Sequence, residues 1–127
     1  MILGVGSDIV CISRIAHLSD GGMEKILSPW EKETYLKPDM NKSDYESLAG
    51  VFAVKEAVSK AFRISLFEIG AKNIEVKKNI NKAPYVVLTS AAEEVIRKYS
   101  PCEYYNVHVS IAHEKEYAVA FAVVESV

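Results

Sequence analysis

The sequence predicts an α+β fold in which an antiparallel sheet packs against a long helix. Half of the 127 residues are hydrophobic, which is enough for a packed core. The longest helical pattern ends near Phe62 and carries a stripe of alanines. Residues 72–78 and 84–89 are typical of a β-hairpin, and two more strand-like segments, 105–112 and 117–125, follow them.

The first third of the chain begins with a strand and continues with short helices. Residues 2–10 are mostly apolar and predict a buried strand. A helical segment around Ser13–Ile15 follows, and the pair Gly21–Gly22 is expected to break it. A Ser-Pro-Trp-Glu sequence then supplies an N-cap, a proline at the first helical position and an acid in the first turn, which predicts a helix over about 28–37.

The remaining elements are a long helix, a second helix and the last strand. A cap within residues 41–44 begins the long helix, which is expected to run to about Phe62. Ser90 is expected to cap a helix over about 91–99, whose early glutamates and late basic residues match the helix dipole. In residues 117–125 large residues alternate with alanines, so one face of this strand is nearly smooth. We expect the alanine stripe of the long helix to pack closely against that face.

Composition argues against several classes of function. The length favours one domain spanning residues 1–127. A net charge of −2 argues against nucleic acid as a partner. The sequence contains no run of about 18 apolar residues, so no membrane-spanning helix is expected. The N-terminus does not resemble a signal peptide. Cys11 and Cys102 form no CxxC pattern and are interpreted as reduced thiols, so a cytoplasmic location is expected.

Charged residues stand on the long helix where apolar residues are expected. Glu56 and Lys60 lie one turn apart on the same face, and at about 100° per residue Arg63 falls beside them. Buried ions need a partner, a metal or a ligand, so one interpretation is a metal and phosphate site. The other is an ordinary exposed pair between Glu56 and Lys60, which stabilises a helix by only about 0.3–0.5 kcal/mol.

Asp8 and His113 are the other candidate site residues. Asp8 lies inside the apolar first strand after Gly4 and Gly6, and glycines allow a backbone or a ligand to approach closely. Asp8 and Glu56 together could hold Mg²⁺, which typically takes one or two carboxylates, several waters and substrate phosphates. Alternatively, Asp8 caps the following helix. His113 ends a strand, and the alternative to a ligand contact is a surface histidine in a turn.

Three segments share their order and spacing with one family. The first is Gly4-x-Gly6-x-Asp8 followed by Arg14, the second is Phe52-x-x-Lys55-Glu56-Ala57-x-x-Lys60-Ala61, and the third is Ser110-Ile111-Ala112-His113-Glu114. They resemble the motifs of the holo-acyl-carrier-protein synthases, which belong to the 4′-phosphopantetheinyl transferase superfamily. The resemblance covers essentially the whole chain, and it implies the 4′-phosphopantetheinyl transferase fold.

The resemblance also implies a reaction. 4′-Phosphopantetheine would pass from coenzyme A to a serine of apo acyl carrier protein, releasing adenosine 3′,5′-bisphosphate. Asp8 and Glu56 would hold Mg²⁺, Lys60 would contact the phosphates and assist the leaving group, and His113 would lie near the nucleotide. Arg14 would help to dock the acidic carrier protein. Either Glu56 or a water on the metal would accept the serine proton. The family is similar in being homotrimeric with sites at subunit interfaces, so a homotrimer is expected.

The chain departs from the family pattern at the expected phosphate and nucleotide contacts. The changed positions are Val51 in place of arginine, residues 62–65 in place of a Gly-Thr-Gly loop, residues 81–84 in place of an Asn-Gly-Lys-Pro turn, and Ala112 in place of serine or threonine. A charge at Arg63 or Lys82 would replace a lost cationic contact with coenzyme A. These changes leave an alternative open, namely a homologue that binds coenzyme A or a carrier protein without catalysis.

Overall fold

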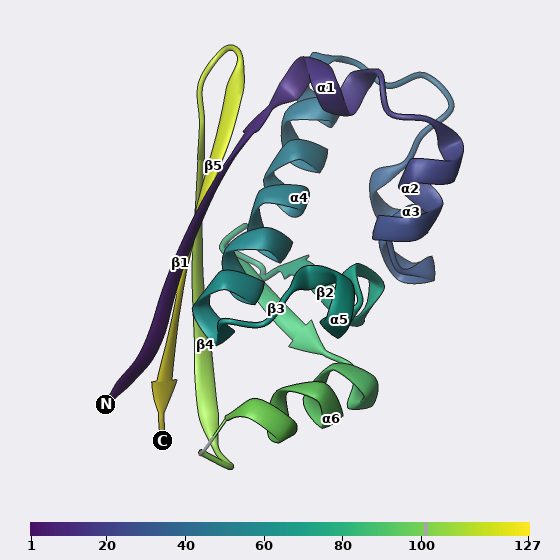
Figure 1. Ribbon diagram of the computed structural model, residues 1–127. Helices are drawn as coiled ribbons and strands as arrows, with labels where there is room; N and C mark the ends of the chain where they lie inside the picture. Colours follow the sequence, from purple (N-terminus) through teal and green to yellow (C-terminus); the bar gives the residue numbers. More distant parts are fainter. Residues whose placement is uncertain (101) are drawn as a thin grey trace.

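The computed structural model describes every residue except residue 101, and it consists of a sheet, a long helix along one face of that sheet, and smaller elements beyond the helix (Figure 1). Strands β1 (Ile2–Cys11), β4 (Tyr105–His113) and β5 (Tyr117–Ser126) form an antiparallel sheet in the order β1-β5-β4. Strands β2 (Ile74–Lys78) and β3 (Pro84–Leu88) form the predicted hairpin. The predicted α+β class, with an antiparallel sheet against a long helix, is confirmed.

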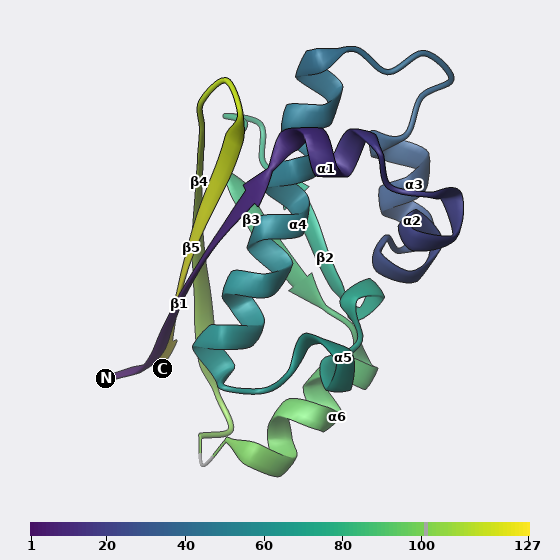
Figure 2. The same ribbon diagram turned by 45° about the horizontal axis from the view of Figure 1, so that its top comes forward.

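The long helix, α4 (Lys42–Phe62), begins at a capping box. The Asn41 side chain accepts the backbone N–H of Asp44, and the Asp44 carboxylate accepts the backbone N–H of Asn41. The shorter helices are α1 (Ile12–Ala16), α2 (Asp20–Ile26), α3 (Pro29–Tyr35), α5 (Leu66–Ile69), the 3₁₀ helix η1 (Ala71–Asn73) and α6 (Ser90–Tyr99). Figure 2 shows α4 between the sheet and helices α2 and α3, with α6 below the end of α4.

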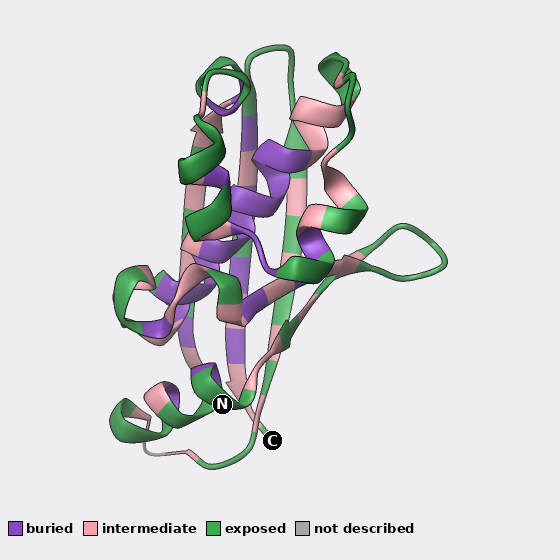
Figure 3. Cartoon of the chain, turned by 90° about the vertical axis from the view of Figure 1, so that its right-hand side faces the viewer, coloured by how far each residue is buried: buried purple, intermediate pink, exposed green. Residues whose placement is uncertain are grey.

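The core lies between α4 and the inner face of the sheet, where the buried stretches of both elements face each other (Figure 3). The alanines of α4 and of β5 are among the fully covered residues, so two nearly smooth surfaces meet and the backbones approach closely. The predicted packing of these stripes is confirmed. The alanines concerned are Ala49, Ala53, Ala57 and Ala61 on α4, and Ala118, Ala120 and Ala122 on β5.

Several local predictions were wrong or incomplete. Strand β1 was expected to be buried, but its outer face is exposed, with Val5 at 67% and Ile9 at 61%. Gly21 and Gly22 do not break a helix but lie inside α2, because Ser19 Oγ accepts the N–H of Gly22 and caps that helix. Thr89, not Ser90, caps α6 through its Oγ1. Helices α5 and η1 were not predicted. Among the residues described, none of the helices combines the length and the apolar character needed to cross a bilayer.

Candidate functional site

Strand β1 approaches α4 closely because two of its inward positions are glycines. A Cβ placed on Gly4 would lie 1.8 Å from the carbonyl oxygen of Ala61, and one on Gly6 would lie 2.0 Å from that of Ala57. The glycines therefore admit the backbone of the helix. Asp8 is the next residue on the same face of the strand, since alternate residues share a face. Its carboxylate is consequently directed toward α4.

Asp8 meets Lys60 at this contact. Lys60 Nζ lies 3.3 Å from Asp8 Oδ1 and donates a hydrogen bond to the carbonyl oxygen of Ser7 at 3.0 Å. Two alternatives raised by the sequence are excluded. The N-cap residue of α1 is Cys11, with no side-chain cap, so Asp8 does not cap that helix. Within the described residues the ion-pair partner of Lys60 is Asp8, not Glu56.

Glu56 and Arg14 line the same cleft as Asp8. This cleft has a volume of about 340 Å³, and apolar side chains from α1, α2, α4 and α5 form much of its wall. Among the residues that the structure describes, the Glu56 carboxylate has no hydrogen-bond or ion-pair partner. Arg14 is exposed on α1. Residues from the first two of the three motif segments therefore come together in one cleft.

The donor set of this cleft fits magnesium. Asp8 and Glu56 offer carboxylate oxygens, which are the ligands that Mg²⁺ prefers, with waters and substrate phosphates completing its coordination. In the described part of the chain no group of three or more histidine, cysteine, aspartate or glutamate side chains is arranged to hold a metal ion. A zinc site, which needs three or four protein ligands, is therefore not supported in that part.

His113 lies away from this cleft within one chain. Its Nδ1 is 3.5 Å from Glu46 Oε2, near the start of α4. It lines a separate cleft of about 190 Å³ together with Lys78 and Lys82. Glu46 precedes Glu56 by about three helical turns, which corresponds to about 15 Å along the helix axis. The His113 side chain and the two carboxylates are therefore not brought together by a single chain.

Arg63 also lies elsewhere. It follows the last residue of α4 with a φ of 62° in the left-handed region, and its backbone N–H bonds to Lys60 and Ser59 carbonyl oxygens at the end of the helix. It lines a third cleft that includes Tyr99. The helical-wheel prediction that placed Arg63 beside Glu56 and Lys60 was wrong, because the helix ends one residue before it.

A buried ion pair next to the site was missed by the sequence reasoning. The side chains of Lys55 and Glu31 are both completely buried, and Lys55 Nζ lies 2.7 Å from Glu31 Oε1. The ammonium also donates to the carbonyl oxygens of Ala71 and Ile74, so all three of its protons are used. Burial lowers the pKa of Lys55, and the neighbouring carboxylate of Glu31 opposes that shift.

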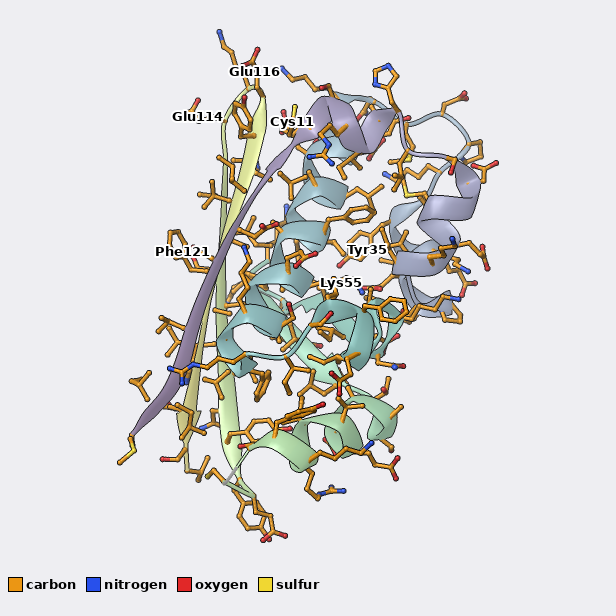
Figure 4. All side chains as sticks on the ribbon, viewed as in Figure 1. Cys11, Tyr35, Lys55, Glu114, Glu116 and Phe121 are labelled. Atoms are coloured by element: carbon orange, nitrogen blue, oxygen red, sulfur yellow. The ribbon has the colours of Figure 1, made fainter. Side chains whose placement is uncertain are left out.

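This pair connects α3, α4 and the hairpin. Glu31 Oε2 accepts the backbone N–H of Val76 at 2.9 Å, and the Tyr35 hydroxyl donates to the Val76 carbonyl oxygen at 2.6 Å. Figure 4 shows the Lys55 and Tyr35 side chains in the region between α4 and α3. Burial, with a smaller contribution from the Glu31 carboxylate, raises the pKa of Tyr35 to about 12. The only sequence signal was a lysine at a helix position surrounded by apolar residues.

Comparison with known proteins agrees with the motifs. The family model of the 4′-phosphopantetheinyl transferase superfamily matches residues 4–122. The chain therefore belongs to the 4′-phosphopantetheinyl transferase superfamily. A curated relative from Clostridium acetobutylicum is 39% identical to this chain, and the alignment covers 98% of each protein. A relative from Bacillus subtilis is 36% identical, and the alignment covers 98% of this chain and 97% of the relative. Both are named holo-[acyl-carrier-protein] synthase, so within the superfamily the chain is one of these synthases, as predicted.

Solved structures agree as well. The crystal structure of a holo-(acyl-carrier-protein) synthase from Bacillus anthracis in complex with CoA (3′,5′-ADP) superposes with a TM-score of 0.82 at 34% identity, covering 100% of this chain and 99% of that one. The synthase from Helicobacter pylori in complex with coenzyme A has a TM-score of 0.70 at 29% identity, and the match covers 95% of this chain and 99% of that one. The expected 4′-phosphopantetheinyl transferase fold is confirmed.

Proposed function

We propose that this chain, as one domain, transfers 4′-phosphopantetheine from coenzyme A to a serine of apo acyl carrier protein. The reaction is proposed to require Mg²⁺ and to release adenosine 3′,5′-bisphosphate. The observation that carries the proposal is the cleft that Asp8, Glu56 and Arg14 line beside Lys60. The names of the relatives support the acceptor, and the complexes of similar synthases with coenzyme A support the donor.

The residues of the cleft suit phosphoryl transfer. The serine oxygen forms a bond to phosphorus while the bond between that phosphorus and the leaving bisphosphate breaks. Asp8 and Glu56 would hold Mg²⁺, which when bound neutralises charge on the pyrophosphate oxygens. Lys60, whose side chain is half exposed, would bind the phosphates and stabilise the leaving group. Glu56 has a carboxylate without a partner among the described residues and is a candidate base for the serine proton.

The remaining predicted residues concern binding. Arg14 is exposed at the rim of the cleft, and a cation there would attract an acidic carrier protein and speed its encounter with the enzyme. His113 and Arg63 are proposed contacts of the coenzyme A nucleotide. Lys82 lines the His113 cleft and would supply a cation where the usual turn sequence is absent. We place the reaction in the cytoplasm, consistent with the free thiols of Cys11 and Cys102.

A homotrimer with shared sites would account for two features of the surface. The outer face of the sheet exposes large apolar side chains, with Val5 at 67%, Ile9 at 61% and Phe121 at 57%. Figure 4 shows Phe121 on the side of the sheet opposite α4. Such patches mark contacts with other proteins. A neighbouring chain would also supply a second His113, which a single chain holds apart from Glu56.

The test is intact mass spectrometry of an apo acyl carrier protein after incubation with this protein, coenzyme A and Mg²⁺. We expect the carrier protein to gain the mass of one phosphopantetheine, and EDTA to prevent the gain. Glu56→Gln should abolish transfer, whereas Glu94→Gln, a matched change on the exposed face of α6, should not. If the folded wild-type protein transfers nothing to several carrier proteins, the proposal fails and the non-catalytic binder is favoured.

A further inference from the structure

In the described structure Lys60 contacts the carboxylate that is proposed to bind the metal. Its ammonium lies 3.3 Å from Asp8 Oδ1, and a hydrogen bond of 3.0 Å to the Ser7 carbonyl oxygen fixes its direction. The Asp8 side chain is only 19% exposed and is held on β1, whereas the Lys60 side chain is 53% exposed. The long Lys60 side chain can therefore move its ammonium away from Asp8, whereas the Asp8 carboxylate cannot move away from the site.

A divalent cation and the Lys60 ammonium cannot both use this oxygen freely. Both are positive, and both are drawn to the single negative charge of the Asp8 carboxylate, whose Oδ1 the ammonium already contacts. In a water-like dielectric the attraction between the Lys60 ammonium and the Asp8 carboxylate, two opposite unit charges 3.3 Å apart, corresponds to roughly a tenfold change in an equilibrium constant. The metal must therefore displace the ammonium from Asp8, and the cost appears as a weaker affinity for the metal.

We propose that Lys60 is an internal counter-ion of Asp8 that competes with the divalent cation until a pyrophosphate-bearing ligand draws the ammonium away. The inference rests on the proposed function, because it takes Asp8 as a metal ligand. It adds a second task for Lys60, before the chemical step. The Ser7 carbonyl is neutral, so phosphate oxygens are the stronger partners of the ammonium.

The competition couples two binding events. When phosphates bind Lys60, Asp8 is released for the metal, and when the metal binds Asp8, Lys60 is released for phosphates. By linkage each ligand then strengthens the binding of the other by the same factor. Without a pyrophosphate-bearing ligand the site would bind the metal only weakly. With that ligand bound, the affinity for the metal would rise.

The experiment measures Mn²⁺ binding by electron paramagnetic resonance, with and without saturating coenzyme A. It compares the wild type with Lys60→Met and with Lys42→Met, which removes the same charge from the exposed start of α4. Without coenzyme A, Lys60→Met should bind Mn²⁺ about tenfold more tightly than the wild type, and Lys42→Met should match the wild type. Coenzyme A should raise the Mn²⁺ affinity of the wild type by a larger factor than that of Lys60→Met.

The outcomes separate this inference from the proposed function. If Lys60→Met binds Mn²⁺ no more tightly than the wild type, the inference is overturned, while metal-dependent transfer by the wild type still stands. If the wild type binds no Mn²⁺ even with coenzyme A, the metal pair of the proposed function fails and the inference fails with it. Lys60→Gln is the second variant should Lys60→Met not fold. Adding Asp8→Asn to either variant should remove the gain in affinity.

Discussion

Gly6→Ala tests the close contact that places Asp8 beside α4. The new Cβ would lie 2.0 Å from the Ala57 carbonyl oxygen and 2.8 Å from the Ala61 nitrogen, whereas ordinary contacts begin at 3.4 Å. Both neighbours are helix backbone, so the strand or the whole helix must move by about 1 Å. Overpacking of this kind costs about 1–3 kcal/mol, and we expect the upper end, out of a total stability of about 5–15 kcal/mol.

Urea denaturation measures the effect, and the midpoint should fall by about 1–2 M. Gly21→Ala is the matched control, because a Cβ there meets only Ser19 Oγ, at 3.9 Å. That variant should be as stable as the wild type or more stable by about 0.5–1 kcal/mol, since alanine suits a helix better. In the Gly6→Ala protein a displaced Asp8 should also lower kcat about 100-fold. If the Gly6→Ala protein were as stable as the wild type, the close approach of β1 and α4 would be refuted.

Four further predictions concern the buried pair, pH, docking and assembly. Glu31→Gln should cost about 3–5 kcal/mol in urea denaturation, because it leaves the Lys55 ammonium buried without its carboxylate; a loss near zero would contradict a buried ion pair. Burial raises the pKa of Tyr35 from 10.0 to about 12, so its contribution to stability is complete below pH 10 and is lost as the pH rises toward 12. Tyr35→Phe should therefore flatten the alkaline loss of stability over this interval, and an unchanged slope would argue against the raised pKa. Arg14→Ala should raise the KM for the carrier protein with little change in kcat in steady-state assays; an unchanged KM would exclude its docking role. Phe121→Asp should shift the mass seen by light scattering from trimer toward monomer and lower activity, and an active monomeric wild type would exclude the trimer.

The sequence predicted the elements that carry strong local signals. The capping box at Asn41 and the alanine stripes located α4 and its packing on β5, because caps and periodicity depend only on neighbouring residues. The motif resemblance singled out Asp8 and Lys60, which the fold brings within 3.3 Å of each other although they are far apart in the sequence. The spacing of the two residues in the sequence gave no information on that distance, because the approach of β1 to α4 sets the distance between their side chains.

The predictions that failed depended on context beyond the local pattern. Gly21 and Gly22 are helix breakers by propensity, but the Ser19 cap and the burial of Met23 keep them in α2. The helical wheel assumes that the helix continues, and it therefore misplaced Arg63, which adopts the left-handed conformation at the end of α4. Burial of Glu31 was not predictable, because its partner on α4 is distant in the sequence and an acid in a first helical turn is normally exposed.

The second motif places a buried structural lysine next to a residue of the proposed metal site. Successive residues of a helix point about 100° apart, so Lys55 is directed into the interior against Glu31 while Glu56 lines the cleft with Asp8. The two lysines of the motif differ in the same way, since the Lys55 side chain is 0% exposed and that of Lys60 is 53% exposed. Loss of Lys55 should therefore be measured as lost stability, and loss of Lys60 as altered binding of metal and phosphate. Kinetic assays alone would not separate them, because a protein that is partly unfolded and a site that binds poorly both turn over slowly.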